Sequence, residues 1–149
     1  MNALSNIDIL RILHGYGITI NGVVSKDLLP RKIPNGWFVI NLEDHDAGEG
    51  THWTCFNKND KGISIYFDSF GFDAPEHLHE TLGDYVSNNS EIQDLGSSCC
   101  GWFCIGLIKY ATSQNTSLPV AMKRYESHFA RNTVLNDSRL EKLLSSVNI

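Results

Sequence analysis

The segment from Cys100 to Ala111 is apolar on nearly every side, and this feature constrains the fold of the 149-residue chain more than any other. A helix that is hydrophobic all round has to be covered by other elements, so the segment predicts a buried helix. Folding a chain of this length buries roughly two-thirds of the surface that the unfolded chain exposes. We therefore expect one domain, spanning residues 1–149, with its core built around this helix.

The rest of the pattern predicts a helix first, then strands, then further helices. Helices are expected at 5–14, from Asp73 and Pro75 to about Val86, and at about 119–131 and 137–146. Strands are expected at 37–42, 51–57 and 62–67, the last two joined as a hairpin, while 18–35 is expected to be irregular. This order of elements indicates an α+β domain.

The same periodicities predict which side chains face the core. The first helix is expected to bury an apolar face formed by Ile7, Leu10, Ile12 and Leu13. The second helix is expected to turn inward Leu78, Leu82 and Tyr85. Strand alternation at 51–57 places on one face His52, Thr54 and Phe56, and on the other Trp53 and Cys55.

Composition and charge exclude several classes of protein. Apolar residues make up 42% of the chain and charged residues 19%, which is typical of a globular protein and not of a disordered one. A formal charge of −5, with no Lys/Arg run longer than two, argues against a constitutive nucleic-acid surface, although a whole-chain count does not test a local patch. No apolar stretch approaches a membrane span, and the N-terminal residues lack the features of a signal peptide, so we expect a protein that is not secreted.

Three of the four cysteines lie within six residues, at Cys99, Cys100 and Cys104, and the fourth is Cys55. A disulfide scaffold spreads its cysteines over long loops, and a structural zinc site uses separated pairs, so neither pattern fits. We expect reduced thiols and no metal site. Cys55 and Cys104 are interpreted as buried small hydrophobic residues.

Three short segments carry the residue types of a thiol protease. Cys100 stands at the predicted N-terminus of the buried helix, where the helix dipole favours a thiolate. His52 could pair with that thiolate and later protonate a leaving amine, while Asp68, at the end of the next strand, could fix the histidine tautomer. The Gln93 side-chain amide and the backbone N–H of Cys100 could hold an oxyanion.

An acidic, glycine-rich loop precedes His52 and contains Asp44, Asp46 and Glu49. Its carboxylates lack the spacing of an EF-hand calcium loop. We interpret it as a solvated loop at the border of a substrate cleft.

These segments resemble the adenovirus-type maturation cysteine proteases, the adenain family. The resemblance rests on Gly-x-His-Trp at 50–53, Phe-Asp-Ser-Phe-Gly-Phe at 67–72, and Gln followed after six residues by Cys-Gly-x-Phe-Cys at 93–104. It runs from about Gly22 to Tyr110 and includes the apolar strand at 37–42 that leads through the acidic loop to the histidine. The length is similar to that of the short members in virophages and Maverick-type elements. Ubiquitin-like-protein-specific proteases are more distant relatives.

The resemblance implies a permuted papain-like fold, with a central mixed β-sheet packed by helices and the catalytic cysteine at the N-terminus of the central helix. The catalytic residues that it implies are His52, Asp68, Gln93 and Cys100. The substrate contacts that it implies are Gly50, Trp53 and Gly101. It also implies a monomeric endopeptidase that cleaves viral capsid or core precursors at Gly-containing sites, in the host cell where particles assemble and in the virion.

Two departures from the family pattern limit what can be carried over. The chain is shorter than the adenovirus enzymes, so a peptide or DNA activator stays an open question, and the sequence itself requires no cofactor. Cys99 stands where the family has a small residue or Asp. Neighbouring residues on a helix point ~100° apart, so only one of the two thiols can face His52, and the family spacing favours Cys100.

Each candidate also has a structural alternative. Asp68 could be a turn acceptor at a strand end, Trp53 could fill the core, and Gln93 could be an ordinary loop residue. The remaining histidines are expected at the surface or in loops: His14, His45, His77, His79 and His128.

Two other functions compete with the maturation protease. A deconjugating isopeptidase acting on ubiquitin-like modifiers would share the chemistry, but it needs a large exosite for a folded modifier, for which 149 residues leave little room. A protease-fold binding module that no longer cleaves is disfavoured because all four chemical positions are filled.

Overall fold

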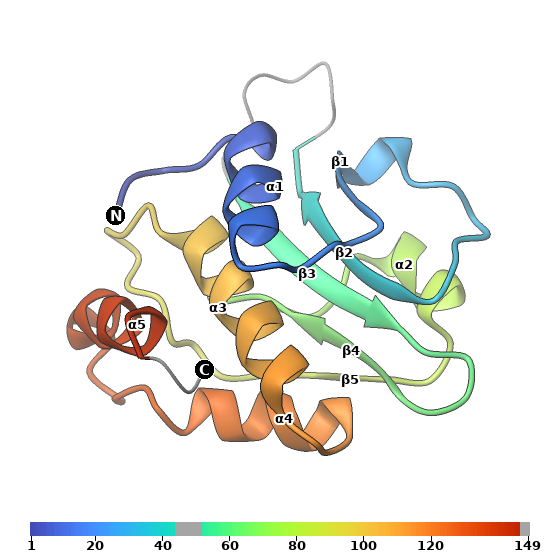
Figure 1. Cartoon of the computed structure of the whole chain (residues 1–149). Coiled ribbons are helices and arrows are strands. Elements are labelled where there is room, and N and C mark those ends of the chain that lie inside the picture. Colours follow the sequence, from blue (N-terminus) through green and yellow to red (C-terminus); the bar gives the residue numbers. More distant parts are fainter. Residues whose placement is uncertain (44–51, 147–149) are drawn as a thin grey trace.

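One five-stranded sheet forms the framework of the computed structural model, which describes residues 1–43 and 52–146. Its strands are Gly22–Ser25 (β1), Gly36–Asn41 (β2), Trp53–Lys58 (β3), Ser64–Phe67 (β4) and Tyr85–Ser87 (β5). They lie in the order β1-β2-β3-β4-β5, with parallel pairing at both edges and antiparallel pairing of β3 with β2 and β4. The sheet is therefore mixed and the fold is α+β, as the sequence predicts (Figure 1).

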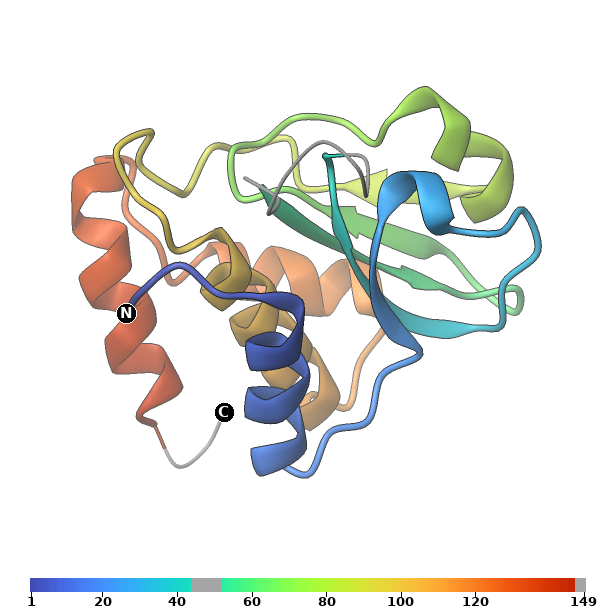
Figure 2. The ribbon, with the colours of Figure 1, turned by 90° about the horizontal axis from the view of Figure 1, so that it is seen from above.

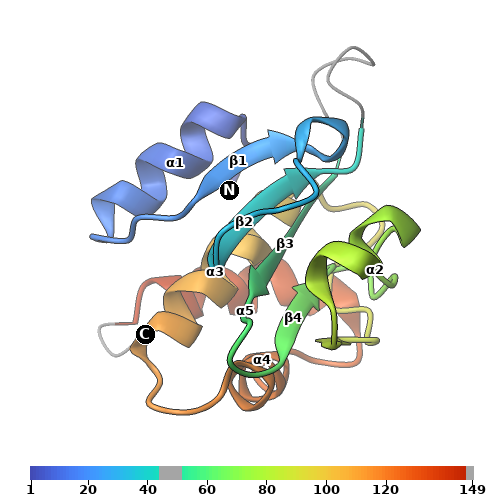
Figure 3. The same cartoon turned by 90° about the vertical axis from the view of Figure 1, so that its right-hand side faces the viewer.

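Helices cover both faces of this sheet. They span Asn6–Gly15 (α1), Glu76–Leu82 (α2), Cys100–Ser113 (α3), Leu118–Glu126 (α4) and Asn136–Leu144 (α5). Short 3-10 turns lie at Lys26–Leu28 and Thr133–Leu135. Figure 2 and Figure 3 show α2 on one face of the sheet and the other helices on the opposite face.

The buried helix predicted at 100–111 is confirmed, and it extends to Ser113 as α3. Phe103, Ile105 and Leu107 have no exposed surface. The helix packs on β3 and is surrounded by α1, α4 and α5, which explains why its sequence has no polar face.

Two apolar clusters lie on opposite faces of the sheet, as strand alternation predicts. Trp53 and Cys55 of β3 join the large cluster around α3. Phe56 joins a smaller cluster under α2, where its ring stacks on Phe38 with centroids 5.3 Å apart. Within the described residues both faces of the sheet are therefore covered, and β3 is buried on both sides from Trp53 to Phe56.

The first helix forms where it is predicted, but its buried face is different. Ser5 caps α1: its hydroxyl accepts the Asp8 N–H at 3.1 Å, and the Asp8 carboxylate accepts the Ser5 N–H at 3.0 Å. The buried residues are Ile9 and Leu13, with Ile12 partly buried.

The predicted apolar face is wrong at two residues, because Ile7 is 60% exposed and Leu10 is 43% exposed. At ~100° per residue, Leu10 points about 100° and Ile7 about 160° away from Ile9, so one stripe cannot bury all three.

The interval 18–35, predicted to be irregular, contains the edge strand β1 and a 3-10 turn. β1 has four residues and only one of them, Val23, is buried, so it carries no alternation signal. Its parallel register with β2 pairs Val23 with Val39 and depends on contacts that are distant in sequence.

The helix predicted to run to about Val86 is too long. α2 ends at Leu82 because Gly83 adopts a φ of 64°, a left-handed conformation that glycine accepts and that terminates helices. Leu78 and Leu82 are buried as predicted. Tyr85 is not part of a helix; it begins β5, which pairs in parallel with β4.

The last two predicted helices are present with changed bounds: α4 ends at Glu126, before the predicted 131, and α5 begins at Asn136. The Asn136 side chain fixes the connection between them. Its Oδ1 accepts the Ala130 N–H at 2.7 Å, and its Nδ2 donates to the Ile92 carbonyl at 2.7 Å. Asn136 is fully buried, so these bonds replace its lost hydration.

The acidic loop residues Asp44, Asp46 and Glu49, together with Gly50, lie outside the described residues. Within 1–43 and 52–146, no helix has both the length and the apolar character needed to cross a bilayer.

Substitution of Gly106 by alanine should destabilise the packing of α3. A Cβ there would lie 2.5 Å from Tyr125 Oη and 2.9 Å from Leu140 Cδ1. Tyr125 is fully buried and its hydroxyl donates to the Phe103 carbonyl at 2.8 Å, so it cannot retreat freely. We expect Gly106→Ala to lower the free energy of unfolding by about 1–3 kcal/mol in urea titrations.

The control for this variant is Gly15→Ala, because a Cβ at Gly15 meets no atom within 4 Å. We expect its free energy of unfolding to stay within about 0.5 kcal/mol of the parent protein. Equal stabilities of the two variants would contradict the packing argument.

Candidate active site

The start of β3, the end of β4 and the start of α3 meet at one end of the sheet. β3 and β4 are antiparallel, with Cys55 opposite Phe67. His52, directly before β3, and Asp68, directly after β4, are therefore brought side by side. α3 packs on β3 with its first residue, Cys100, at the same end, because the Trp53 N–H points at Cys100 Sγ at 3.4 Å.

A small cavity joins these residues. His52, Trp53, Phe70, Gln93 and Cys100 contribute to its wall, and its volume is about 200 Å³. Of the six predicted site residues that the structure describes, these include four. Asp68 lies behind His52, and Gly101 lies beneath Trp53.

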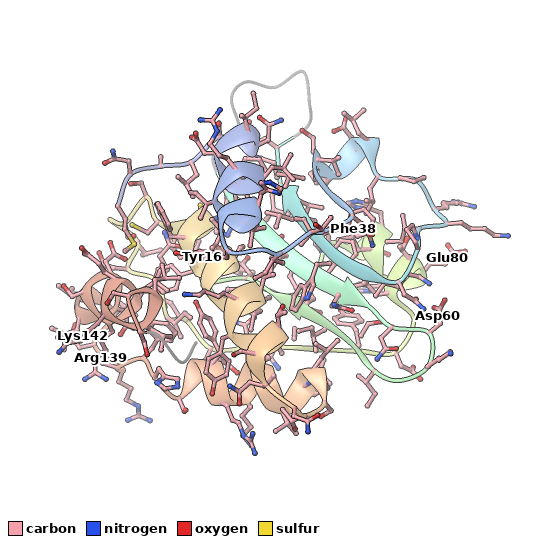
Figure 4. The ribbon with its side chains drawn as sticks, viewed as in Figure 1. Tyr16, Phe38, Asp60, Glu80, Arg139 and Lys142 are labelled. Carbon is pink, nitrogen blue, oxygen red and sulfur yellow. The ribbon has the colours of Figure 1, made fainter. Side chains whose placement is uncertain are left out.

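A larger hollow of about 730 Å³ lies between the 29–33 segment, the β3–β4 hairpin and α2. Asp60 and Glu80, two of its lining residues, are labelled at the edge of the molecule in Figure 4. It shares no lining residue with the cavity at Cys100. This hollow is the larger of the two, but the Cys100 thiol, the His52 imidazole and the Gln93 amide all line the smaller cavity.

His52 and Asp68 form a tight pair. His52 Nε2 lies 2.7 Å from Asp68 Oδ1; the His52 side chain is 15% exposed and that of Asp68 is 1% exposed. The imidazole stacks on the Phe70 ring, with centroids 4.6 Å apart, and the Phe70 N–H donates to the same Oδ1 at 2.8 Å. The carboxylate therefore fixes the ring orientation of His52, and Phe70 holds both partners.

The second ring nitrogen, His52 Nδ1, is buried and has no hydrogen-bond partner of normal geometry among the described residues. Because Nε2 is occupied by Asp68, Nδ1 is the nitrogen left to act on a neighbour. Cys100 is a candidate for that neighbour, since both side chains line the same cavity.

The pKa of His52 is raised from 6.5 to about 9. Burial by itself would lower it, but the hydrogen bond with Asp68, the polar interaction with the Cys100 thiol and the charges of both groups outweigh the burial. The site thus favours the protonated form of the His52 imidazole.

Asn88, which sequence reasoning missed, holds the backbone of Asp68. Its Oδ1 accepts the Asp68 N–H at 3.1 Å and its Nδ2 donates to the Asp68 carbonyl at 2.7 Å. The residue stands one position after β5 in a polar stretch of the sequence, and an asparagine there gives no signal of this contact.

Cys100 is the first residue of α3, and no side chain caps the helix. The first N–H groups of an α-helix have no partner within the helix, so the start of α3 favours negative charge close to it. Cys100 is 6% exposed and is the one cysteine of the four that lines the cavity with His52.

The other thiols have different surroundings. Cys99 Sγ lies 3.7 Å from the Met1 carbonyl, and burial, assisted by the nearby Asp137 carboxylate, raises its pKa. Cys104 is fully buried, and burial raises its pKa strongly. Cys55 is also fully buried, and all four cysteines are unpaired. The interpretation of Cys55 and Cys104 as buried residues is confirmed.

Gln93 is held by two serines. Its Oε1 accepts the Ser69 hydroxyl at 2.5 Å and its Nε2 donates to the Ser97 carbonyl at 2.9 Å. Gln93 and Ser69 are fully buried. Because the hydroxyl bonds the amide oxygen, the amide nitrogen is directed to the side of the loop that leads into α3. Neither serine was identified from the sequence, although Ser69 is part of the Phe-Asp-Ser-Phe-Gly-Phe motif.

Ser97 also ties this loop to α5. Its hydroxyl accepts the Cys99 N–H at 3.1 Å and donates to Asp137 Oδ1 at 2.9 Å. The residues before Cys100 are thus fixed from both sides, by the segment after β4 through Ser69 and by α5 through Asp137.

Trp53 is 6% exposed and its indole N–H donates to the Leu4 carbonyl at 2.9 Å. Gly101 is buried beneath it: a Cβ at Gly101 would lie 3.3 Å from Trp53 Cδ1 and 3.3 Å from Leu4 Cδ1. Gly101 is needed here for a close approach. Gly50, the third predicted substrate contact, lies outside the described residues.

The remaining histidines that the structure describes are exposed, as predicted: His14, His77, His79 and His128. His45 lies outside the described residues. Among the residues at 1–43 and 52–146, no group of three or more His, Cys, Asp or Glu side chains could hold a metal ion.

No protein-family model matches the sequence, and no curated protein matches it.

The pKa of His52 predicts how stability depends on pH. The folded-state pKa of His52 is about 9, against an ordinary value of 6.5. Protonated His52 therefore contributes its full amount to the free energy of unfolding below pH 6.5, and this contribution is lost as pH rises through 9. We expect the stability difference between the parent protein and His52→Gln to shrink by about 3 kcal/mol between pH 6 and pH 10, as a shift of this size implies. Urea titrations at stepped pH measure it, and a difference that grows with pH would contradict the assignment.

Proposed function

We propose that the protein is a cysteine endopeptidase in which Cys100 is the nucleophile, His52 the general base and acid, Asp68 the orienting carboxylate and Gln93 an oxyanion donor. One observation carries the proposal: the imidazole of His52 is held by a buried carboxylate at 2.7 Å and stands beside the thiol at the start of a helix, in one cavity with a buried amide. Three segments far apart in sequence bring these groups together, as the chemistry of acyl transfer requires.

Acylation follows from the position of each group. The Cys100 thiolate, stabilised by the His52 imidazolium and the start of α3, attacks the carbonyl carbon of the scissile peptide bond. The negative charge that develops on the carbonyl oxygen is stabilised by the Gln93 amide and the Cys100 N–H. His52 then gives its proton to the leaving amine, and a thioester to Cys100 remains.

Deacylation uses the same groups in reverse. His52, now neutral, takes a proton from a water molecule that attacks the thioester carbon. The tetrahedral intermediate uses the same oxyanion donors and collapses to release the acid and the Cys100 thiolate. Asp68 keeps the ring nitrogen facing the thiol available throughout, because its bond to Nε2 fixes the ring.

The proposed fold is the permuted papain-like arrangement, in which His52 and Asp68 precede the nucleophile in the chain. Support comes from α3, which begins at Cys100 and is central, and from the placement of the histidine and carboxylate on adjoining strand ends. The resemblance to the adenain family supports the same arrangement.

The proposed substrates are viral capsid or core precursor proteins, cleaved at Gly-containing sites at the assembly site in the host cell and in the virion. The support is the adenain-like motifs together with a narrow cavity at Cys100. The proposed enzyme works as a monomer and needs no cofactor for its chemistry, and an activating peptide or DNA would modulate it from outside the site.

The nucleophile is tested with a pair of adjacent cysteine variants. Cys100→Ala should abolish peptide cleavage, whereas Cys99→Ala should retain most of it, because the Cys99 thiol is directed at the Met1 carbonyl. Limiting iodoacetamide, followed by peptide mapping, should label Cys100 before Cys99. Activity that survives Cys100→Ala would overturn the assignment.

The substrate class is tested by incubating the protein with structural precursor proteins of a virus-like particle and with ubiquitin-like fusions that end in Gly-Gly, followed by N-terminal sequencing of the fragments. Cleavage of the precursors at Gly-containing sites supports the maturation protease. Cleavage of the fusions alone would favour the deconjugating isopeptidase, and cleavage of neither would favour the binding module.

The oxyanion donor is tested through Gln93 and the serine that orients it. Gln93→Ala should lower kcat by ~10²-fold, as removal of one oxyanion donor does elsewhere. Ser69→Ala should lower kcat roughly tenfold with little change in KM, because it frees the amide to rotate. The control is Ser64→Ala at a buried serine at the start of β4, whose hydroxyl accepts the Asn59 N–H; this variant should leave kcat unchanged. A Gln93→Ala enzyme at full rate would remove the amide from the site.

A further inference from the structure

The first four residues pass the N-terminal end of α3 on their way to α1 (Figure 1 and Figure 2). Two indoles hold them by the backbone: Trp53 donates to the Leu4 carbonyl and Trp102 donates to the Asn2 carbonyl, both at 2.9 Å. Carbonyls two residues apart point the same way in an extended chain, so the two bonds fix one side of the segment against the protein.

Leu4 lies where the segment meets the candidate site. Its Cδ1 and Cβ stand 3.3 and 3.4 Å from the position that a Cβ on Gly101 would take, and Trp53 Cδ1 stands at 3.3 Å from the same point. Leu4 and Trp53 therefore close together over the residue that follows Cys100. No β-carbon fits between them without a shift.

The segment also lines the cavity itself. Ala3 and Leu4 form part of its wall, together with His52, Gln93 and Cys100. The volume of about 200 Å³ is below the ~300–1,000 Å³ common for small-molecule sites. Removing the Leu4 side chain would enlarge this space next to the thiol, because Leu4 is one of its walls.

We propose that Leu4, fixed through the Asn2 and Leu4 carbonyls by Trp102 and Trp53, is a specificity-determining residue that sets the width of the approach to Cys100. The Leu4 wall leaves room for the backbone of a substrate peptide but not for a side chain. Glycine, which lacks a β-carbon, therefore fits at the substrate residue next to the scissile bond. For its substrate the inference rests on the proposed peptidase function. The width of the approach is a property of the cavity and does not rest on it.

The first arm of the test measures access to the thiol and needs no catalysis. Second-order rates of Cys100 alkylation are measured by peptide mapping with iodoacetamide, which is slender, and with N-ethylmaleimide, which carries a ring. Leu4→Ala should raise the rate of alkylation by N-ethylmaleimide roughly fivefold or more and leave the iodoacetamide rate within about twofold of the parent value. Only the larger reagent is restricted by the Leu4 side chain, so only its rate depends on the space that the substitution opens.

Two further variants test the hydrogen bond to Asn2 and provide a control. Trp102→Phe keeps the aromatic ring but removes the donor to the Asn2 carbonyl. It should change the two alkylation rates in the same way as Leu4→Ala does, but by a smaller factor. Leu10→Ala is the control, because Leu10 is 43% exposed on the outer side of α1 and does not line the cavity. It should leave both rates unchanged.

The second arm uses two peptides that differ only in Gly or Ala at the residue before the scissile bond. Leu4→Ala should narrow the Gly preference in kcat/KM by about tenfold or more, chiefly by raising the rate on the Ala peptide. An unchanged preference together with unchanged alkylation rates would overturn the inference. An equal increase in the alkylation rates of both reagents and the cleavage rates of both peptides would also overturn it. That result would mean that the N-terminal segment covers the whole site and does not select by width.

The two proposals fail in different ways. If the parent protein cleaves neither peptide but Leu4→Ala still accelerates the maleimide selectively, the peptidase function is lost and the role of Leu4 as the wall is supported. If the parent protein cleaves the Gly peptide, the peptidase function is supported. If Leu4→Ala then changes neither the ratio of the two alkylation rates nor the Gly-to-Ala ratio of kcat/KM, Leu4 does not set the width of the approach.

Discussion

The burial of α3 is the constraint on which the rest of the structure depends. A helix without a polar face needs cover on every side, and the sheet, α1, α4 and α5 supply it. The end of this helix is the exception, because its first N–H groups require polar partners. The protein therefore buries most of α3 and brings the candidate site residues Cys100, His52 and Gln93 together at the N-terminal end of the same helix.

Periodicity predicted the elements that are long or buried, and it failed where a short strand or a glycine decided the structure. α3, β2 and the β3–β4 hairpin were predicted because each has a clear apolar pattern. β1 and β5 were missed, since four- and three-residue edge strands are too short to show one. The excess length given to α2 came from reading Tyr85 as part of a helical stripe, although Gly83 breaks the helix two residues earlier.

The candidate site was predictable to the extent that its chemistry is carried by reactive side chains. His52, Asp68, Gln93 and Cys100 stand in short motifs, and the structure brings them to one end of the sheet. Their supports were not predictable, because Asn88, Ser69 and Ser97 act through hydrogen bonds to backbone or amide groups. Asparagine and serine are common in loops, and such bonds are visible only once distant segments are placed together. The N-terminal segment was missed for the same reason.

The ties between the loop at 92–99 and α5 have a consequence for the order of folding. Asn136 binds the Ile92 carbonyl, and Asp137 binds the Ser97 hydroxyl that holds the Cys99 N–H. A chain emerging from the ribosome thus lacks these anchors until about forty residues beyond the loop have been made, although the thiol and imidazole are already present. Domains fold as units during synthesis, and here the reactive end of α3 acquires its final geometry only when α5 docks. While those residues are made, the nascent chain would carry the chemical groups of the site without the arrangement that joins them.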